Sequence, residues 1–204
     1  MSSRATYSPS GRIPQRTHGH LRREAMIDAA SAILSEIGED GLTLHAAAQR
    51  ANSSVGSMYH FFSDRDQLLR AVADRHRTAL CEITAPNHDI PPQDWQAMPA
   101  DALIRRLFQA PLDYFAAHPD ALVTEYLQDA GPSAAFQALL LRIMQSRYGE
   151  AQGTRLAATL YAVSTGTITH VCEMRKTGVM PETIDIPGVL IAYLERAERD
   201  AARD

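Results

Sequence analysis

The feature that most constrains the fold is a pair of short helical segments joined by a tight turn, between residues 43 and 61. Thr43 and Ser54 each stand where a helix can begin, because their side-chain oxygens can accept a hydrogen bond from a free backbone N–H of the first turn. Asn52 and Ser53 separate the two segments and favour a turn. The spacing predicts helices of about eight residues on either side of a turn of about three, as in a helix-turn-helix.

Longer helices are predicted on both sides of this pair. Apolar residues recur at intervals of three and four from Met26 to Ile37, which is typical of one buried helix face, and Gly38 ends the pattern. After the pair, Ser63 and Asp64 can cap a helix that continues to about residue 83.

The remainder of the chain is also predicted to be helical. Residues 85–99 contain four prolines, which break the helical pattern and indicate a boundary. Strands that alternate apolar and polar residues are not indicated, so the sequence predicts an all-α protein. The expected helices beyond the boundary cover residues 100–117, 121–129, 134–148, 154–176 and 187–199.

Charge is distributed unevenly along the chain. Residues 1–80 contain ten arginines and eight acidic residues, whereas the remaining residues contain ten basic and sixteen acidic ones. Arg4, Arg12 and Arg16 lie in a segment, residues 1–20, that is rich in Ser, Pro and Gly and reads as a flexible basic arm. A basic end on an acidic body favours a nucleic-acid partner at that end, and a solvated tail remains the alternative.

The segment from Arg22 to Leu69 resembles the N-terminal signature of the tetracycline-repressor (TetR) family. The most specific part is Ser54–Phe62, in which Tyr59 is followed three residues later by Phe62, and then by Arg65 and a leucine pair. The resemblance covers about a quarter of the chain and implies a transcriptional regulator that reads DNA with a helix-turn-helix, in which the second helix of the pair enters the major groove.

Side-chain chemistry assigns roles within this unit that agree broadly with the resemblance. Val55 can contact a thymine methyl group, Tyr59 can donate its hydroxyl to a phosphate, and Arg65 can clamp a phosphate. The helix N-terminus at Thr43 offers free N–H groups to a phosphate. The predicted DNA-contact residues are Thr43, His45, Ser54, Val55, Gly56, Ser57, Tyr59, His60 and Arg65.

Other interpretations of these residues stay open at this point. Asn52, Ser53 and Ala47 depart from the family pattern; Asn52 tolerates the left-handed conformation that glycine would supply, and the other two predict softer packing. Tyr59 could instead be a half-buried core aromatic. Met58 and Phe62 are assigned to the core, and an ordinary surface position is favoured for His76.

The region from residue 100 onward carries no catalytic signature, so an enzyme is disfavoured. The family resemblance implies a helical ligand-binding and dimerisation domain. No cofactor or metal is expected, and the histidines at 18 and 20 are weak metal candidates. The residues suggested for a ligand pocket are Tyr114, His118, Tyr126, His170 and Glu173. The residues suggested for the core or a subunit interface are Leu156, Leu160, Val163, Ile168 and Val171.

These observations define the organisation and function that we expect. Residues 1–20 form the arm, 21–65 the DNA-binding domain and 66–204 the regulatory and dimerisation domain. The expected protein is a homodimeric, cytoplasmic repressor that a small-molecule effector releases from a pseudo-palindromic operator in double-stranded DNA. The alternative is a DNA-binding protein that responds to a protein partner. Neither a membrane span nor a secretory signal is expected.

Overall fold

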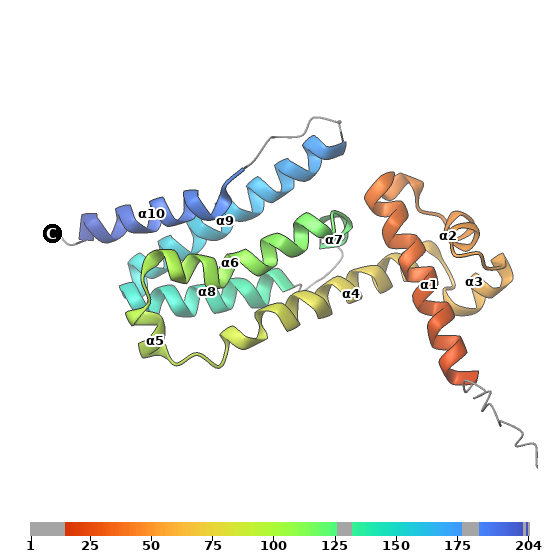
Figure 1. Cartoon of the computed structure of the whole chain (residues 1–204), viewed down its shortest axis with the longest axis horizontal. Helices are drawn as coiled ribbons and strands as arrows, with labels where there is room; N and C mark the ends of the chain where they lie inside the picture. The colour runs from red at the N-terminus through yellow and green to blue at the C-terminus, as the bar shows by residue number, and fades with distance from the viewer. Residues whose placement is uncertain (1–14, 126–131, 177–183, 202, 204) are drawn as a thin grey trace, which may run out of the picture. The chain divides into compact units, whose positions relative to one another are not determined.

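A computed structural model describes residues 15–125, 132–176, 184–201 and 203, without the side chains of 15–17, 123–125, 132–133, 172–173 and 175–176. Every regular element in these ranges is a helix, which confirms the all-α prediction (Figure 1). The chain forms two compact units, Met1–Leu68 and Leu69–Asp204. The predicted domain boundary, between residues 65 and 66, falls in the first turn of one helix, α4 (Arg65–Thr84).

The first unit is a small helical domain in which α2 packs against both α1 and α3. Met26, Ile33, Met58 and Phe62 are among the buried side chains of this unit, as their sequence pattern predicts. Its helical elements are α1 (Gln15–Glu36), the 3-10 turn η1 (Glu39–Gly41), α2 (Leu44–Arg50) and α3 (Val55–Phe61), followed by the start of α4.

The predicted arm is wrong between residues 15 and 20, because α1 begins at Gln15 rather than at Leu21. These six residues include no large apolar side chain, so a helical turn there produces no periodic pattern. Within this added turn, His20 Nδ1 lies 3.8 Å from the Glu24 carboxylate one turn later. The remainder of the predicted arm, residues 1–14, lies outside the described residues.

A charged pair ties the end of α1 to the end of α2. The Arg50 guanidinium donates two hydrogen bonds to the Glu36 carboxylate, at 2.6 and 2.5 Å. Such paired bonds fix orientation as well as distance. The pair lowers the pKa of Glu36, chiefly through the hydrogen bond from Arg50.

The second unit packs its helices around one apolar core that includes Leu103, Leu107, Leu140 and Leu160. The helices α8 and α9 lie side by side over much of their lengths (Figure 1). The elements of this unit are the remainder of α4, η2 (Ala85–Asn87), α5 (Pro92–Ala97), α6 (Ala100–Ala117), α7 (Asp120–Glu125), α8 (Pro132–Tyr148), α9 (Glu150–Lys176) and α10 (Ile186–Ala201).

Gly153 permits the close approach of α8 and α9. A Cβ atom at this position would lie 2.5 Å from the backbone of Gln145, which no side chain tolerates. The hairpin that joins the two helices turns at Gly149, whose φ of 78° lies in the left-handed region that glycine adopts without strain. Two glycines four residues apart therefore set how tightly this helical hairpin closes.

The proline-rich segment 85–99 is not the boundary that the sequence suggested. It contains α5, and Trp95 on this helix is only 2% exposed in the core of the second unit. Proline is compatible with the first position of a helix because its missing N–H would have no helical partner there. Pro91 and Pro92 therefore begin α5 where they were expected only to interrupt helical structure.

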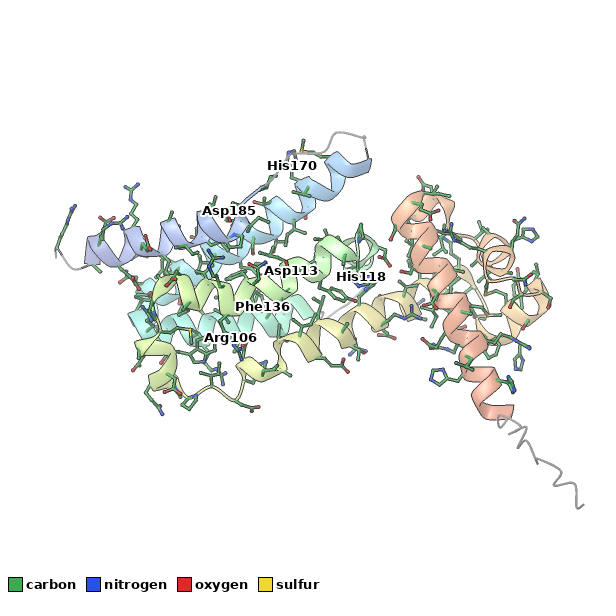
Figure 2. The ribbon with its side chains drawn as sticks, in the orientation of Figure 1. Arg106, Asp113, His118, Phe136, His170 and Asp185 are labelled. Carbon is green, nitrogen blue, oxygen red and sulfur yellow. The ribbon has the colours of Figure 1, made fainter. Side chains whose placement is uncertain are left out.

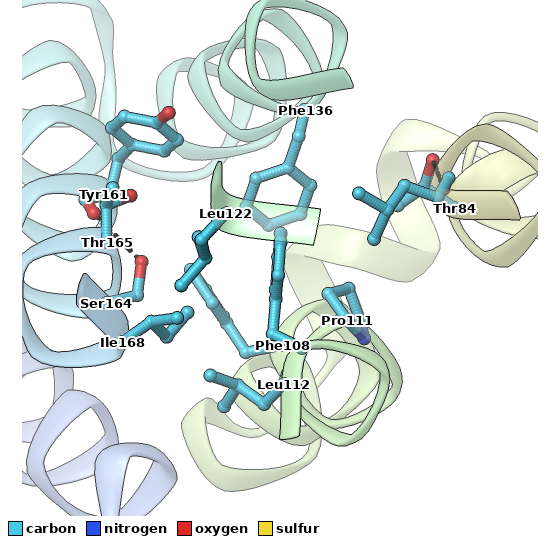
Figure 3. A pocket seen from close by; sticks show the side chains of 12 residues that line it. Thr84, Phe108, Pro111, Leu112, Leu122, Phe136, Tyr161, Ser164, Thr165 and Ile168 are labelled. Atoms are coloured by element: carbon cyan, nitrogen blue, oxygen red, sulfur yellow. Dashed lines mark hydrogen bonds between the residues drawn. The ribbon is translucent and has the colours of Figure 1, made fainter. Parts of the chain in front are cut away.

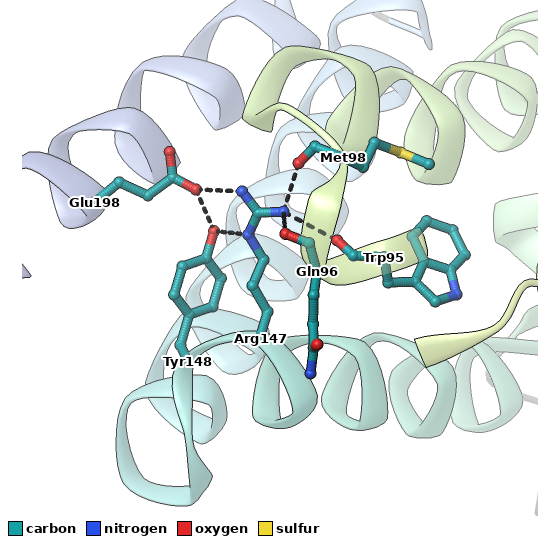
Figure 4. Close-up of polar contacts among 6 residues, drawn as sticks. All are labelled: Trp95, Gln96, Met98, Arg147, Tyr148 and Glu198. Carbon is teal, nitrogen blue, oxygen red and sulfur yellow. Dashed lines mark hydrogen bonds and ion pairs between the residues drawn. The ribbon is translucent and has the colours of Figure 1, made fainter. Parts of the chain in front are cut away.

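A single guanidinium anchors the end of α5 (Figure 4). Arg147 near the end of α8 donates to the carbonyl oxygens of Trp95, at 2.9 Å, Gln96, at 3.0 Å, and Met98. It also donates to Glu198 of α10, at 2.7 Å. These bonds satisfy carbonyl groups that the short helix leaves without helical partners, and they join three helices around one charge.

Candidate functional site

The helix-turn-helix is built as the sequence predicts, with a side-chain cap at the start of each short helix. Thr43 Oγ1 accepts a hydrogen bond from the Ala46 N–H at 3.0 Å and thereby begins α2. Ser54 Oγ accepts from the Ser57 N–H at 3.1 Å and begins α3. The capping prediction is confirmed for both residues; their contacts with DNA stay a prediction.

The turn between α2 and α3 depends on Asn52. Its φ of 49° lies in the left-handed region, where asparagine is tolerated more readily than most residues. The departure from glycine at this position is therefore compatible with the turn. The neighbouring departure, Ala47, is fully buried between the helices.

The recognition helix α3 has one buried and one exposed face. Met58 is completely buried, and Phe62 just after the helix is 1% exposed. Tyr59 is 59% exposed, so the interpretation of Tyr59 as a core aromatic is wrong. His60 on α3 and His45 on α2 are also exposed. The described unit thus presents an aromatic hydroxyl and two imidazoles to solvent, as a reading surface requires.

The start of α3 leaves room for close approach by a ligand. Gly56 is exposed, and a Cβ atom built on it would meet no other atom within 4 Å. Internal packing therefore does not require glycine here. Val55 and Ser57, on either side of Gly56, are half-buried. The open space at Gly56 is compatible with close approach from outside the domain, and a contact of Gly56 with DNA stays a prediction.

Arg65, predicted to clamp a phosphate, also makes several bonds within the first unit. Its guanidinium donates to the Leu42 carbonyl at 3.0 Å and to the Glu39 carbonyl at 2.9 Å, and it pairs with the Glu39 carboxylate at 3.0 Å. These bonds hold the segment before α2 against the start of α4. The structure therefore engages Arg65 in positioning the helix-turn-helix, while its contact with a DNA phosphate stays a prediction.

The second unit contains a cavity of about 60 Å³ (Figure 3). Phe108 and Phe115 from α6, Phe136 from α8 and Tyr161 from α9 give it aromatic walls. The last turns of α4 contribute Leu80 and Thr84. The lining is mostly apolar with a few hydroxyl groups, which is the usual composition of a small-molecule site.

None of the residues suggested for a ligand pocket is among the described lining residues. Tyr114 and His118 stack against each other with ring centroids 4.4 Å apart, on a neighbouring part of α6. His170 is exposed on α9, and Figure 2 shows it far along that helix. Tyr126 lies outside the described residues, as does the side chain of Glu173.

The expectation of a surface position for His76 is wrong. His76 is 3% exposed, and its two ring nitrogens face Asp120 and the Tyr114 hydroxyl, each at 2.7 Å. The polar residues Tyr114 and His118 thus belong to a cluster around His76. The suggested pocket residues were chosen for their polarity, whereas the described cavity lining is mostly apolar and includes three phenylalanines, Phe108, Phe115 and Phe136, that were assigned to no site.

The suggested core and interface residues divide into two groups. Leu156 and Leu160 are buried in the core of the second unit. Val163 and Ile168 pack against that core from partly buried positions, and Ile168 also lines the cavity. Val171 is half-buried.

Two further site classes find no support in the part of the chain that the structure describes. No helix there is long and apolar enough to cross a membrane. No cluster of three or more histidine, cysteine, aspartate or glutamate side chains with the geometry of a metal site occurs among the same residues.

Comparison with known proteins shows what the helix-turn-helix segment is similar to. Residues 26–72 match the profile of "Bacterial regulatory proteins, tetR family". A transcriptional regulator named BetI, from Burkholderia thailandensis, is 42% identical over 59 residues, which is 29% of this chain. The match spans only 30% of that relative's length.

Solved structures extend the likeness in fold to the second unit. A TetR-like transcriptional regulator from Rhodococcus sp. RHA1 superposes with a TM-score of 0.63 over 92% of this chain and 99% of its own, at 20% identity. The multidrug-binding protein EbrR, solved with malachite green, has a TM-score of 0.51 over 78% of this chain and 98% of its own, also at 20% identity. The BetI protein and the Rhodococcus protein are both described as transcriptional regulators. Over residues 26–72, the chain thus carries a helix-turn-helix segment like that of the tetR family of bacterial regulatory proteins.

Proposed function

We propose that this regulator is a homodimeric repressor that leaves its operator when a small molecule fills the cavity of the second unit. The observation that carries the proposal is the course of α4. This helix begins with Arg65, which holds the helix-turn-helix segment, and ends with Leu80 and Thr84 in the cavity wall. One continuous helix therefore joins the reading unit to the ligand site.

The reading surface supports DNA recognition through α3. Val55 and Tyr59 are four residues apart and share a helix face. Ser57, His60 and the exposed Gly56 lie beside them on the same short helix. We assign base contact to Val55 and phosphate contact to Tyr59, with Thr43, His45 and Ser54 at the edge of the surface.

Dimerisation is part of the proposal because one short helix reads too few bases for useful specificity. A two-fold dimer would place two copies of α3 about 34–36 Å apart, one turn of DNA, on a pseudo-palindromic operator. Exposed apolar side chains on α10 support a subunit interface there: Val189 is 55% exposed and Tyr193 is 36% exposed. Because the proposed partner is operator DNA, we propose that the protein acts in the cytoplasm.

Effector release requires a ligand that binds the DNA-free form more tightly than the DNA-bound form. The cavity is smaller than a typical ligand, so a bound molecule must displace part of its walls, and we propose that the last turns of α4 are among the parts that move. Coupling of about 1–3 kcal/mol is usual between two such sites. EbrR, solved with malachite green, is a precedent for ligand binding in a protein of this fold.

The proposal is tested by selecting bound fragments from genomic DNA and titrating the selected operator by fluorescence anisotropy. A library of small molecules is first screened by thermal shift, and each molecule that binds is added to the operator complex. We expect at least one to lower operator affinity. If every ligand that binds the free protein also leaves the operator complex intact, effector release is wrong, and regulation by a protein partner becomes the better explanation.

The dimer is tested by light scattering. A monomeric mass for a protein that still binds the operator tightly would contradict the dimer.

A further inference from the structure

The described walls of the cavity carry no charged side chain (Figure 3). Placing an ion in apolar surroundings without an opposite charge costs several kcal/mol or more. The nearest carboxylate in sequence to the lining residue Leu122 is Asp120, and Asp120 is already bonded to His76 at 2.7 Å. The described residues of the cavity wall therefore offer no charged partner to a cationic or an anionic ligand.

Two hydroxyl groups of the wall, those of Ser164 and Thr84, are oriented as hydrogen-bond acceptors toward a ligand. Ser164 is 5% exposed, and its hydroxyl donates its hydrogen to the Tyr161 carbonyl at 2.9 Å. The Thr84 hydroxyl donates in the same way to the Leu80 carbonyl at 3.0 Å. A hydroxyl has one hydrogen and two lone pairs, so both oxygens retain the capacity to accept. A matching ligand brings an O–H or N–H donor.

Size restricts the ligand further. The cavity of about 60 Å³ has room for roughly two water molecules. An apolar cavity of about 150 Å³ is known to hold benzene, so even a one-ring ligand must displace side chains here. Phe108 and Phe136 meet edge to face, with centroids 5.3 Å apart, and offer ring surfaces against which an inserted ring can pack.

We propose that the cavity binds an uncharged one-ring compound that carries a hydroxyl group, such as an alkylphenol, and that it rejects ions of the same shape. The inference rests on the proposed effector site and names its ligand class. The hydroxyl group donates to Ser164 Oγ while the ring packs between the phenylalanines. A lipophilic cation such as malachite green, the ligand of EbrR, is excluded because no described wall residue compensates its charge.

An isosteric pair of probes tests the charge rule directly. 4-tert-Butylphenol and the 4-hydroxyphenyltrimethylammonium ion have nearly the same shape and differ by one positive charge. Calorimetric titration of the full-length protein should give binding of the phenol and at least about 100-fold weaker binding of the cation, since the cation loses its hydration without gaining a partner. Equal or tighter binding of the cation overturns the inference, and so does failure of the phenol to bind at its solubility limit.

Three variants test whether the phenol binds in the cavity and whether it donates a hydrogen bond to Ser164. Ser164→Ala should weaken the phenol by about 3- to 10-fold, the range for one neutral hydrogen bond. Thr167→Ala is the matched control, because Thr167 on the same helix makes a similar bond, to the Val163 carbonyl at 2.7 Å, but does not line the cavity. Leu122→Trp, which fills the cavity, should abolish binding. Phenol binding that survives Leu122→Trp, or that falls equally in the first two variants, overturns the assignment.

The two proposals fail separately in this experiment. If the phenol binds as described but operator affinity is unchanged, the ligand class stands and effector release is wrong. If the cation binds and also releases the operator, effector release stands and the ligand class is wrong.

Discussion

Nε2 of His76 on α4 lies 2.7 Å from Oδ2 of Asp120 at the start of α7, and both side chains are buried. The other ring nitrogen of His76 lies 2.7 Å from the Tyr114 hydroxyl on α6. Burial, followed by the charge of Asp120, raises the pKa of Tyr114 and keeps that hydroxyl protonated. One imidazole therefore joins α4 to α6 and α7 beside the cavity.

Removing the carboxylate should destabilise the second unit strongly. Asp120→Ala leaves a buried imidazole nitrogen without its partner, and we expect a loss of about 3 kcal/mol in the free energy of unfolding, measured with urea. Asp74→Ala is the control, because it removes the exposed pair with Arg77 on the same helix and should cost less than about 1 kcal/mol. If both variants lose similar amounts of unfolding free energy, the buried pair stabilises the unit no more than an exposed pair does.

Alkaline pH should weaken the second unit through Tyr148. Burial, and then the hydrogen bond to Glu198, raise the pKa of Tyr148 far above that of an exposed tyrosine. The folded state thus favours the neutral phenol. This stabilisation is fully present below the unfolded pKa of about 10 and is lost as pH rises from there toward the folded pKa. Urea unfolding at increasing pH should show a shallower decline for Tyr148→Phe than for the parent, whereas Tyr59→Phe, at an exposed position on α3, should decline as the parent does.

Arg65 should act on stability rather than on the salt dependence of DNA binding. Arg65→Lys retains the charge but cannot reproduce the bonds to the Leu42 and Glu39 carbonyls together. We expect a loss of about 1–2 kcal/mol in the stability of the first unit, measured by thermal unfolding. The slope of operator affinity against salt should not change. If an Arg65→Ala variant keeps its stability but reduces that slope by about one, the result would show that Arg65 contacts a phosphate.

Gly56 should matter for DNA binding and not for folding. Gly56→Ala adds a methyl group in open space on the reading helix, so the fold should be as stable as before or gain up to about 1 kcal/mol. Operator affinity should fall about tenfold or more, or about 1.4 kcal/mol, because the methyl group obstructs close approach. Gly166→Ala on α9, where a Cβ atom also meets nothing within 4 Å, is the control and should leave affinity unchanged. If Gly56→Ala leaves operator affinity unchanged, DNA does not approach α3 closely at Gly56.

Val55 and Tyr59 should separate reading from positioning. Tyr59→Phe removes one hydrogen bond to phosphate, so it should weaken operator and random DNA by similar factors, at most about 1.5–3 kcal/mol. Val55→Ala should weaken the operator alone by about 1 kcal/mol and relax preference at one base pair in each half-site. Competition binding with both DNAs measures this. If Val55→Ala lowers the affinity for operator and random DNA equally, Val55 does not read a base, and base contact must come from Ser57, His45 or His60.

Local chemistry made much of the reading unit predictable. The caps at Thr43 and Ser54 and the left-handed Asn52 depend on atoms within three or four residues, so residue type and spacing predicted them. The start of α1 was missed because a solvent-exposed turn needs no apolar residue. The bonds of Arg65 to the Leu42 and Glu39 carbonyls were not predicted, because these partners lie 23 and 26 residues away, beyond any local pattern.

The sequence by itself determined the all-α class, most of the helices, the caps at Thr43 and Ser54 and the helix-turn-helix, since hydrogen bonds within one or two turns decide them; α5 and the first turn of α1 were not predicted. Tertiary structure alone decided which polar and proline-flanked residues are buried and where the cavity lies. His76 is polar and was expected at the surface, but partners 38 and 44 residues away satisfy its nitrogens inside the second unit. Trp95 is buried although it follows two prolines. The cavity exists only where five helices fail to fill the space between them, because packing depends on shapes that meet in three dimensions rather than on neighbours in the chain.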